Sequence, residues 1–315
     1  MSPPILEFRR NAARRDRTCD WSPPGLSIVI PFLRDDPRPL LDALVEQAGD
    51  DPSAVELIVI DDGAPDRALT DAVWLEVDAA PCPASLIVSR RNLGRSGARN
   101  RLADEAIADW VLFLDADMRI EPDFVRRWRE GLDAAPFDAA FGGFDIDADD
   151  AERHRVHAAL ARAGDIASAE ARRRIGPSAV CASNLAVRRA FLARARFDEA
   201  YIGWGWEDVD WAIRAARTGD LTHIDNPARH GGLEDVEALI AKFAAGGRNH
   251  ARLLDQAQEM RVQPAGRLAI WMKRLGLHQP GGAVGRRLAR AQRAPARLRA
   301  LGLKLHRAAA CAEHL

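Results

Sequence analysis

The chain has 315 residues, 47% of them hydrophobic, which suffices for one large α/β domain and excludes a chain that is disordered throughout. The formal net charge of -1 gives no reason to expect a nucleic acid as a partner. The four cysteines lie far apart, the N-terminus lacks an apolar signal sequence, and no apolar run is long enough to span a bilayer. A cytoplasmic protein is therefore expected.

Residues 1–24 are rich in Arg and Pro, and we expect an irregular arm there. Short apolar runs then alternate with patterns of helical spacing. Strands are expected at 26–32, 55–62, 84–90 and 110–114, with helices at 37–48, 66–77 and 94–108. Strands that alternate with helices in this way indicate βαβ units on a mostly parallel sheet, and hence an α/β fold.

The pattern loosens after Pro136. Helices are expected at 151–174, 206–219 and 233–256, with shorter strands between them. Beyond Val262 the chain becomes basic, with Glu313 as its single acidic residue, and has amphipathic helical patterns broken by Pro and Gly. We therefore divide the chain into an arm, 1–24, a main domain, 25–260, and a basic helical tail, 261–315.

Carboxylates follow two of the expected strands. Asp61 and Asp62 end the second strand, and the sequence Asp115-Ala116-Asp117 follows the fourth, the carboxyl end where open parallel sheets bind ligands. Side chains alternate in an extended segment, so Asp115 and Asp117 point the same way and repel each other. A cation is expected between them, and Mg²⁺ or Mn²⁺ would complete its shell with phosphate oxygens.

Other interpretations of this DXD sequence exist. It can be a solvated turn after a strand, or it can mark a haloacid-dehalogenase-like phosphatase, in which the first Asp is a nucleophile near the N-terminus. Such an enzyme needs Thr or Ser after the motif and a downstream Lys, whereas Met118 and Arg119 follow here. Enzymes of sugar-nucleotide synthesis have a Gly-rich N-terminal loop, which "PFLRDDPRP" does not resemble.

From about Leu26 to about Gln256 the chain resembles a family 2 glycosyltransferase of the GT-A fold, a nucleotide-binding α/β/α sandwich. The resemblance rests on five motifs in the family's order: "LSIVIPF", "LIVIDDGAPD", "NLGRSGARN", "VLFLDADM" and "GWGWEDVDW". The last is close to the acceptor motif of galactosyltransferase-type enzymes. The resemblance implies that residues 25–120 bind the nucleotide sugar and that residues 121–260 bind the acceptor.

The activity implied is inverting, metal-dependent transfer of a sugar from a nucleotide-diphosphate sugar, expected to be a UDP-sugar. The acceptor would be a hydroxyl of a saccharide or of a lipid-linked acceptor, as in cell-surface polysaccharide or glycolipid assembly. The donor-binding residues implied are Pro31, Asp61, Asp62, Asn92, Arg95, Arg99, Asp115 and Ala116. The metal ligands implied are Asp117, Asp115 and His230, with His223 as a weaker alternative to the histidine.

Several of these residues also have plain structural interpretations. Asp61 or Asp62 can cap the turn at Gly63, and Arg95 and Arg99 can be surface charges, although one of them is expected to bind the diphosphate. The segment "PFLRDD" lacks the polar residue that the family usually has after its first strand. Which side chain there contacts the base is left open.

On the acceptor side, the resemblance implies Asp208 as the catalytic base and Glu207 as the residue that holds acceptor hydroxyls. Trp204 and Trp206 are expected to stack on sugar rings, although a buried aromatic cluster at a helix N-terminus remains an alternative. The basic tail can pack on the domain or lie on the anionic inner face of the cell membrane. A non-catalytic carbohydrate-binding or assembly protein with the same fold is the alternative to an enzyme.

Overall fold

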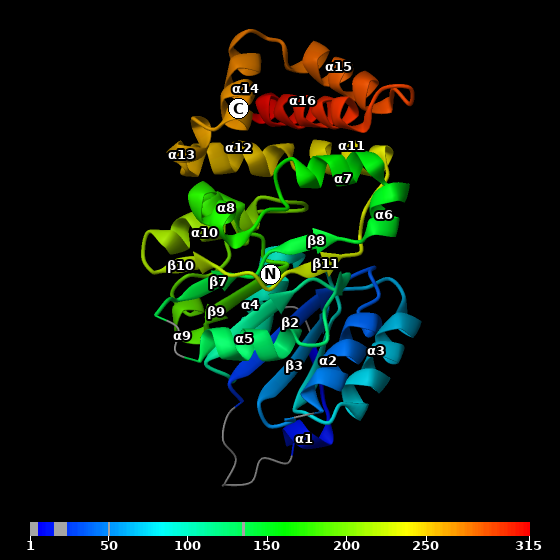
Figure 1. The fold of residues 1–315 in the computed structure, drawn as a ribbon, viewed down its shortest axis with the longest axis vertical. Helices are drawn as coiled ribbons and strands as arrows, with labels where there is room; N and C mark the ends of the chain where they lie inside the picture. Colours follow the sequence, from blue (N-terminus) through cyan, green and yellow to red (C-terminus); the bar gives the residue numbers. More distant parts are fainter. Residues whose placement is uncertain (1–5, 16–23, 50, 134–135) are drawn as a thin grey trace.

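An eight-stranded, mostly parallel sheet forms the centre of the computed structural model, which describes residues 6–15, 24–49, 51–133 and 136–315 (Figure 1). The strand order is β1-β4-β3-β2-β5-β9-β7-β10. Its parallel half consists of β2 (Leu26–Phe32), β3 (Val55–Asp61), β4 (Ala84–Ser89) and β5 (Trp110–Leu114). The other half contains β7 (Ala139–Phe141), β9 (Asn184–Arg188) and β10 (Leu221–His223), of which β9 runs antiparallel to both of its neighbours.

Helices cover both faces of this sheet, so its central strands are buried along nearly their whole length. On one face, α2 (Arg38–Ala48), α3 (Arg67–Ala79) and α5 (Phe124–Leu132) share a core with Ile28 and Ile30. On the other, α4 (Gly94–Glu105) and α10 (Glu207–Ala216) pack over Val29 and Ile58. The predicted α/β/α sandwich is confirmed.

The expectation of an irregular N-terminal arm is wrong for the part that the structure describes. Leu6–Arg10 forms β1, which pairs antiparallel with β4 along the edge of the sheet, and α1 (Ala12–Arg15) follows. Asn11 fixes this segment, because its side-chain nitrogen donates to the carbonyl oxygens of Ala80 and Cys82. The remaining residues of the arm, 1–5 and 16–23, lie outside the described residues.

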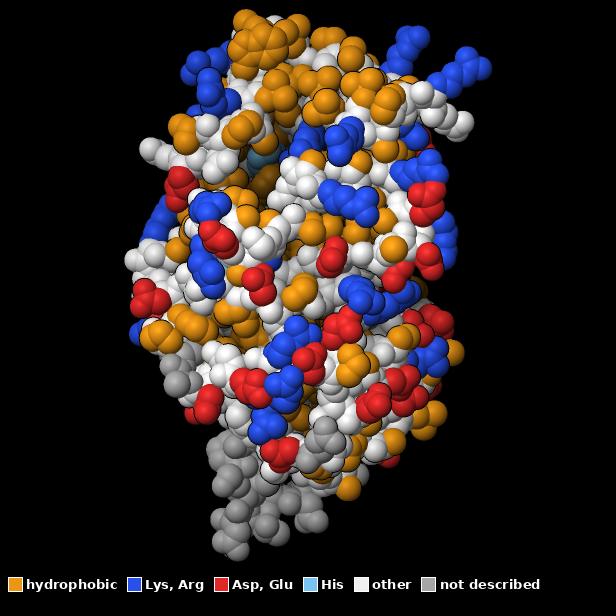
Figure 2. Space-filling view, viewed as in Figure 1, with side chains coloured by type: hydrophobic (Ala, Val, Ile, Leu, Met, Phe, Trp, Pro, Cys, Tyr) orange, Lys and Arg blue, Asp and Glu red, His pale blue; other side chains and the backbone are white. Residues whose placement is uncertain are grey.

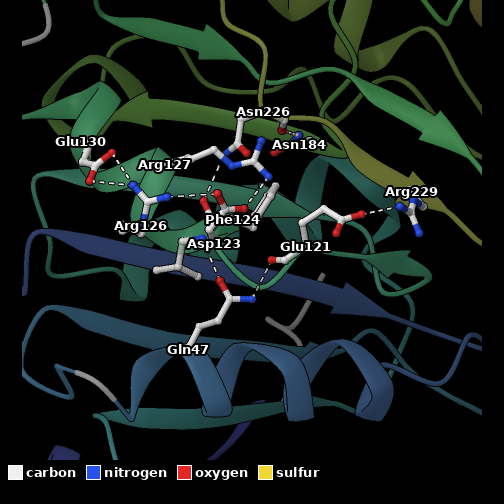
Figure 3. A network of polar contacts seen from close by, with 11 residues as sticks. Gln47, Glu121, Asp123, Phe124, Arg126, Arg127, Glu130, Asn184, Asn226 and Arg229 are labelled. Carbon is white, nitrogen blue, oxygen red and sulfur yellow. Dashed lines mark hydrogen bonds and ion pairs between the residues drawn. The ribbon is translucent and has the colours of Figure 1, made fainter.

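A second, three-stranded sheet brings distant parts of the chain together at the carboxyl end of β5. It consists of β6 (Met118–Arg119), β11 (Ala228–His230) and β8 (Phe144–Ile146), with β11 in the middle. A polar network supports the segment between β6 and α5, in which Gln47 of α2 donates to the Glu121 carbonyl and accepts from the Val125 N–H (Figure 3). Asn226 extends it by donating to the Phe124 carbonyl.

Helices dominate the rest of the chain, and in Figure 1 most of them lie above the small sheet. Before residue 207 they are α6 (Ala148–Arg153), α7 (Arg155–Arg162), α8 (Ala169–Ile175), η1 (Pro177–Ala179) and α9 (Arg189–Leu192). After it come α11 (Val236–Ala245), α12 (Gly247–Gln256), α13 (Gln258–Arg261), α14 (Pro264–Arg274), α15 (His278–Arg290) and α16 (Ala296–His314). Within the described ranges, no helix has the length and apolarity needed to cross a bilayer.

The expected division between a main domain and a tail at residue 261 is not a boundary in the packing. Leu254 of α12 shares one buried cluster with Met272 of α14 and Cys311 of α16. Phe243 of α11 shares another with Leu303 of α16. The apolar faces of the tail helices therefore pack largely against the preceding helices α11 and α12.

Candidate active site

The carboxylates of the DXD sequence lie in a tight turn directly after β5. The Asp115 N–H donates to the Ser183 carbonyl across 3.3 Å, and the Met118 N–H donates to the Asp115 carbonyl across 3.2 Å. Ala116 is buried in the core between them, while the side chains of Asp115 and Asp117 are 24% and 21% exposed. Both side chains thus stay partly exposed, but they lie in a turn and not in the extended segment that the sequence predicts, and they contact different partners.

His230 lies beside Asp117, with 3.4 Å between His230 Nε2 and Asp117 Oδ2. The antiparallel pairing of β11 with β6 creates this contact, and the Gly231 N–H donates to the Asp117 carbonyl across 2.9 Å. The fit is close, because a Cβ atom on Gly232 would overlap the Asp117 carboxylate. His223 instead lies in β10 of the large sheet, where it is buried edge-on against Phe141 and burial lowers its pKa to about 4.

Arg99 lies under the DXD turn, and only 2% of its side chain is exposed. Its Nη1 atom donates to Glu207 Oε1 across 2.8 Å, and its Nη2 atom donates to Asp115 Oδ1 across 3.2 Å. Burial opposes its charge, but the carboxylates of Asp115 and Glu207 outweigh burial and raise the pKa of Arg99. Arg99 therefore joins the two acidic motifs, whereas the sequence leads us to expect a contact with a diphosphate.

This arrangement makes the two DXD carboxylates unequal. Burial alone would raise the pKa of Asp115, but the charges of Arg99, Arg95 and His230 hold it below its usual value. Burial raises the pKa of Asp117, and the charge of Asp115 adds to that effect while His230 opposes it. A desolvated carboxylate next to an imidazole is a donor pair that suits a divalent cation.

Among the described residues, the side chains at the DXD turn do not form a complete metal-binding group. Among the residues that the structure describes, no three His, Cys, Asp or Glu side chains stand together as a metal-binding group. The reason is visible in the contacts, since Asp115 Oδ1 is turned toward Arg99 while Asp117 faces His230. Asp117 and His230 fit a cation that takes its other ligands from a diphosphate and water, as Mg²⁺ commonly does.

On the expected nucleotide side, the two acids after β3 differ. Both carboxylate oxygens of Asp61 are engaged within the protein, by the Ala64 N–H and by the Thr70 hydroxyl, each across 2.6 Å. Asp61 therefore caps the turn. Asp62 Oδ1 accepts from the Leu93 N–H across 2.6 Å, and burial raises the pKa of Asp62 to about 6.

The remaining expected donor residues surround the same edge of the sheet. Pro31 is opposite Ile60 near the carboxyl end of β2. Asn92 is exposed and donates to the Asp62 carbonyl across 3.1 Å. The Arg95 side chain is 43% exposed, with its Nη1 atom 3.9 Å from Glu207 Oε1. Of the two arginines expected to bind the donor, Arg95 is the one whose side chain remains exposed.

The acceptor motif forms a strained entry to α10. Trp206 has a φ of 77°, in the left-handed region that disfavours large side chains, between Gly205 with a φ of 84° and the first turn of the helix. The two acids that follow differ in exposure. Glu207 is buried against Arg99, whereas Asp208 is partly accessible. Burial and the charge of Glu207 raise the pKa of Asp208 to about 6.

The tryptophans of this motif are more enclosed than expected. Trp206 stacks on His250 with 4.0 Å between ring centroids and an angle of 10° between the rings. Trp204 packs against Phe243 at 5.6 Å. Trp211 is fully buried and donates to the Ala195 carbonyl. The structure thus uses much of the aromatic surface for internal packing, leaving Trp204 and Trp206 only partly accessible.

Sequence reasoning missed Cys181 and Asp165, which lie outside the helices and strands. Burial raises the pKa of the Cys181 thiol well above its usual value, and the charges of Asp208, Asp165, Asp115 and Glu207 add to this effect. Asp165 follows α7, and no motif singles it out. A contact between segments so far apart in the chain has no local sequence signal.

Comparison with known proteins identifies the family of this chain. The family model of glycosyl transferase family 2 matches residues 27–196, more than half of the chain. The chain belongs to glycosyl transferase family 2. The match contains the DXD turn and Arg99 but ends before Glu207, so it covers the donor side and not the acceptor motif.

The curated relatives of this family 2 glycosyltransferase share only part of its length. The succinoglycan biosynthesis protein ExoO of Rhizobium meliloti (strain 1021) is 38% identical over 93 residues, 29% of this chain and 25% of the relative. The glycosyltransferase YibD of Escherichia coli (strain K12) is 33% identical over 99 residues, 31% of this chain and 27% of the relative. The chain thus matches about a quarter of each relative's length.

Solved structures extend the likeness over nearly the whole fold. A mannosyltransferase from Pyrobaculum calidifontis, solved with GDP-Man and Mn²⁺, has a TM-score of 0.58 at 17% identity and covers 95% of this chain and 91% of its own. Residues 1–349 of TarS from S. aureus, solved with UDP, have a TM-score of 0.54 at 14% identity and cover 90% and 89%. These similarities confirm the GT-A fold of this family 2 glycosyltransferase.

Proposed function

We propose that this glycosyltransferase transfers a sugar with inversion from a UDP-sugar to a hydroxyl of a saccharide or lipid-linked acceptor, with Mn²⁺ or Mg²⁺ bound. The observation that carries the proposal is the Arg99 bridge between Asp115 and Glu207. It joins a carboxylate-imidazole pair on one side, Asp117 and His230, to the partly accessible Asp208 on the other. One side suits a diphosphate and its metal, and the other suits a nucleophile that approaches from the opposite face.

In the proposed reaction the acceptor hydroxyl attacks the anomeric carbon while the bond from that carbon to the diphosphate breaks. The electron pair of the broken bond leaves with UDP, and the hydroxyl proton passes to Asp208. A carboxylate with a pKa of about 6 is well matched to accepting a proton near neutral pH. The transition state is oxocarbenium-like, as in glycoside hydrolysis.

On the donor side, Asp117 and His230 would hold the metal, which supplies positive charge against the diphosphate when it is bound. Arg95 would add a second, mobile positive charge at the same group. Asp62, Asn92 and Pro31 are the proposed contacts for the nucleoside, since Asp61 is occupied by the turn. The Mn²⁺ bound to the mannosyltransferase neighbour supports this metal choice.

The identity of the donor can be tested directly. Purified protein is incubated with UDP-glucose, UDP-galactose, UDP-N-acetylglucosamine, UDP-N-acetylgalactosamine and GDP-mannose, and ligand-induced stabilisation is measured with Mn²⁺. Donors that stabilise the protein are then assayed for nucleotide release with and without EDTA. We expect UDP-sugars to stabilise and EDTA to abolish UDP release. Stabilisation without any release would favour the non-catalytic carbohydrate-binding alternative.

A lipid-linked acceptor would require contact with a membrane, and one surface suits this role. Apolar side chains gather over α14–α16 in Figure 2, where Trp271, Leu275 and Val284 are 52%, 55% and 58% exposed. A hollow next to them is lined by Ala283, Arg286, Arg287, Arg290 and Ala291. Exposed apolar groups beside arginines are the composition that binds anionic lipid surfaces. We propose that this surface holds the protein at the inner face of the cell membrane.

Sedimentation with anionic liposomes tests this surface. A variant with Trp271→Ser and Val284→Ser should no longer sediment with the liposomes but should still bind UDP. Leu75→Ser, at a 69% exposed position on α3, is the matched control and should sediment like the wild type. Equal sedimentation of all three proteins would contradict membrane contact. Removing the tail is a poor test, because its helices complete the buried core.

A further inference from the structure

Arg307, a cationic side chain of the last helix, lies against the acceptor motif. The guanidinium carbon of Arg307 in α16 lies 5.5 Å from the ring centre of Trp206 and 5.4 Å from that of Phe243. His250 also stacks on Trp206, at 4.0 Å. Within the described part of the chain, the Arg307 guanidinium contacts aromatic rings, and no hydrogen bond or ion pair engages it. Trp206 immediately precedes Glu207 and Asp208, so this cation belongs to the acceptor side.

Charged groups near Arg307 are accessible to solvent. Arg307 and Asp208 are partly accessible, and Asp165 is exposed. The thiol of Cys181 experiences the charges of both Asp208 and Asp165, and Asp165 in turn experiences that of Arg307. The proposed base and Arg307 therefore belong to one group of neighbouring charges that solvent reaches.

In this group of charges, Arg307 and Lys304 both act on Asp165, so two cations face one carboxylate. A partly buried guanidinium without a direct counter-ion is a ready partner for a carboxylate or phosphate, which it can bind in a bidentate manner.

We propose that Arg307 binds an anionic group of the acceptor, a carboxylate or a phosphate carried by the saccharide, and so selects acidic acceptors. The proposal rests on the proposed function, because it takes the accessible surface at Trp206 and Asp208 as the acceptor site. The family match ends at residue 196 and assigns nothing to Trp206 or Arg307. In this arrangement the tail helix completes the acceptor site, and Trp206 positions the guanidinium through its ring face.

The test compares matched sugars that differ in charge. Binding of methyl β-glucuronide, methyl β-glucoside and methyl β-glucoside 6-phosphate to the full-length protein is measured by ligand-observed NMR titration, with and without UDP and Mn²⁺. The wild type should bind at least one of the anionic sugars about ten-fold or more tightly than the neutral one, as expected for a charge-assisted hydrogen bond. The glucuronide and phosphate arms decide which anion is preferred.

Variants then assign the preference to one side chain. Arg307→Gln should abolish it, Arg307→Lys should retain part of it, and Arg297→Gln, at an exposed position of the same helix, should leave it unchanged. If Arg307→Gln does not fold, a reduced preference in Arg307→Lys gives the same answer. Equal binding of charged and neutral sugars by the wild type, or a full preference in the Arg307 variants, would overturn the proposal.

Failure of the proposed function would look different. UDP binding with Mn²⁺ is titrated on the same samples and should be the same in the wild type and in all three variants. A protein that binds no UDP yet prefers anionic sugars through Arg307 would contradict the donor site and keep the inference about Arg307. A protein that binds UDP without any preference among sugars would support the donor site and contradict the inference about Arg307.

Discussion

Arg99 Nη1 donates to Glu207 Oε1 across 2.8 Å, and each side chain is at most 3% exposed. The pair joins α4 to the first turn of α10. The second bond of Arg99, to Asp115, ties the DXD turn to the same point. The positions of these three segments therefore depend on one buried guanidinium.

Replacing Arg99 should destabilise the protein. Arg99→Met leaves two carboxylates without their counter-ion, and breaking a buried pair in this way costs about 3–5 kcal/mol. Arg95→Met, on the exposed side of the same helix, should change the free energy of unfolding by no more than about 0.5 kcal/mol. Urea denaturation of both variants measures the difference. Similar stabilities would mean that the Arg99 bridge is not a structural link.

Crowding at Gly232 gives a test of the proposed metal pair that changes neither ligand. Gly232→Ala introduces a Cβ atom that overlaps the Asp117 carboxylate, so the carboxylate must turn away from His230. We expect the fold to survive. The Mn²⁺-dependent part of UDP affinity should fall about ten-fold or more, because the ion would lose one of its ligands. Gly164→Ala, where the added atom meets nothing within 4 Å, is the control. Unchanged metal dependence in Gly232→Ala would separate Asp117 from the metal.

Asp208 and Glu207 should give different kinetic defects. Asp208→Asn keeps the shape but removes the proton acceptor, so kcat should fall by about 10²–10⁴-fold, the usual contribution of a general base. UDP affinity should stay the same. Glu207→Gln should weaken acceptor binding and rate, and it should also lower stability because Glu207 is the partner of Arg99. If Asp208→Asn keeps more than about a tenth of the wild-type kcat, Asp208 is not the base.

Asp208 also predicts opposite effects of pH on activity and on stability. Its pKa is raised from 3.8 to about 6, so between these values the folded protein holds a proton that the unfolded chain has released. The free energy of unfolding contributed by Asp208 is therefore present below pH 3.8 and is lost as the pH rises through about 6. Activity should rise over the same range as the base loses its proton.

Unfolding and rate measurements between pH 3.8 and pH 7 check these slopes. Asp208→Asn should remove the contribution of Asp208 to the fall in the free energy of unfolding with rising pH. Asp78→Asn, at an exposed position, should leave the wild-type pH profile unchanged. A wild-type rate that does not change across pH 6 would exclude Asp208 as the titrating base.

The donor side of the site could be predicted from sequence because its signals are local. An apolar strand followed by Asp115-Ala116-Asp117 fixes which side chains face outward, and the alternation of strands and helices fixes the sheet edge to which they belong. The proximity of His230 to Asp117 was also expected, although from the resemblance and not from any pattern in the sequence. The structure places the two side by side through the pairing of β11 with β6.

The rest could not be predicted, because it depends on contacts between distant segments. Arg99 and Arg95 differ by one helical turn, and only the packing of α10 makes the first buried and leaves the second exposed. Leu6–Arg10 is too short and too basic to be recognised as a strand until β4 pairs with it. Arg307 reaches Trp206 only because α16 folds back over α11 and α12.

The most direct test is a calorimetric titration of UDP into the wild type, Asp117→Ala and Asp208→Asn, each with and without Mn²⁺. We expect Mn²⁺ to strengthen UDP binding by the wild type and by Asp208→Asn, and Asp117→Ala to lose this gain while its fold is retained. The reason is that Asp117 pairs with His230 in the proposed metal site, whereas Asp208 is the proposed base. Full Mn²⁺-dependent affinity in Asp117→Ala would exclude Asp117 from that site.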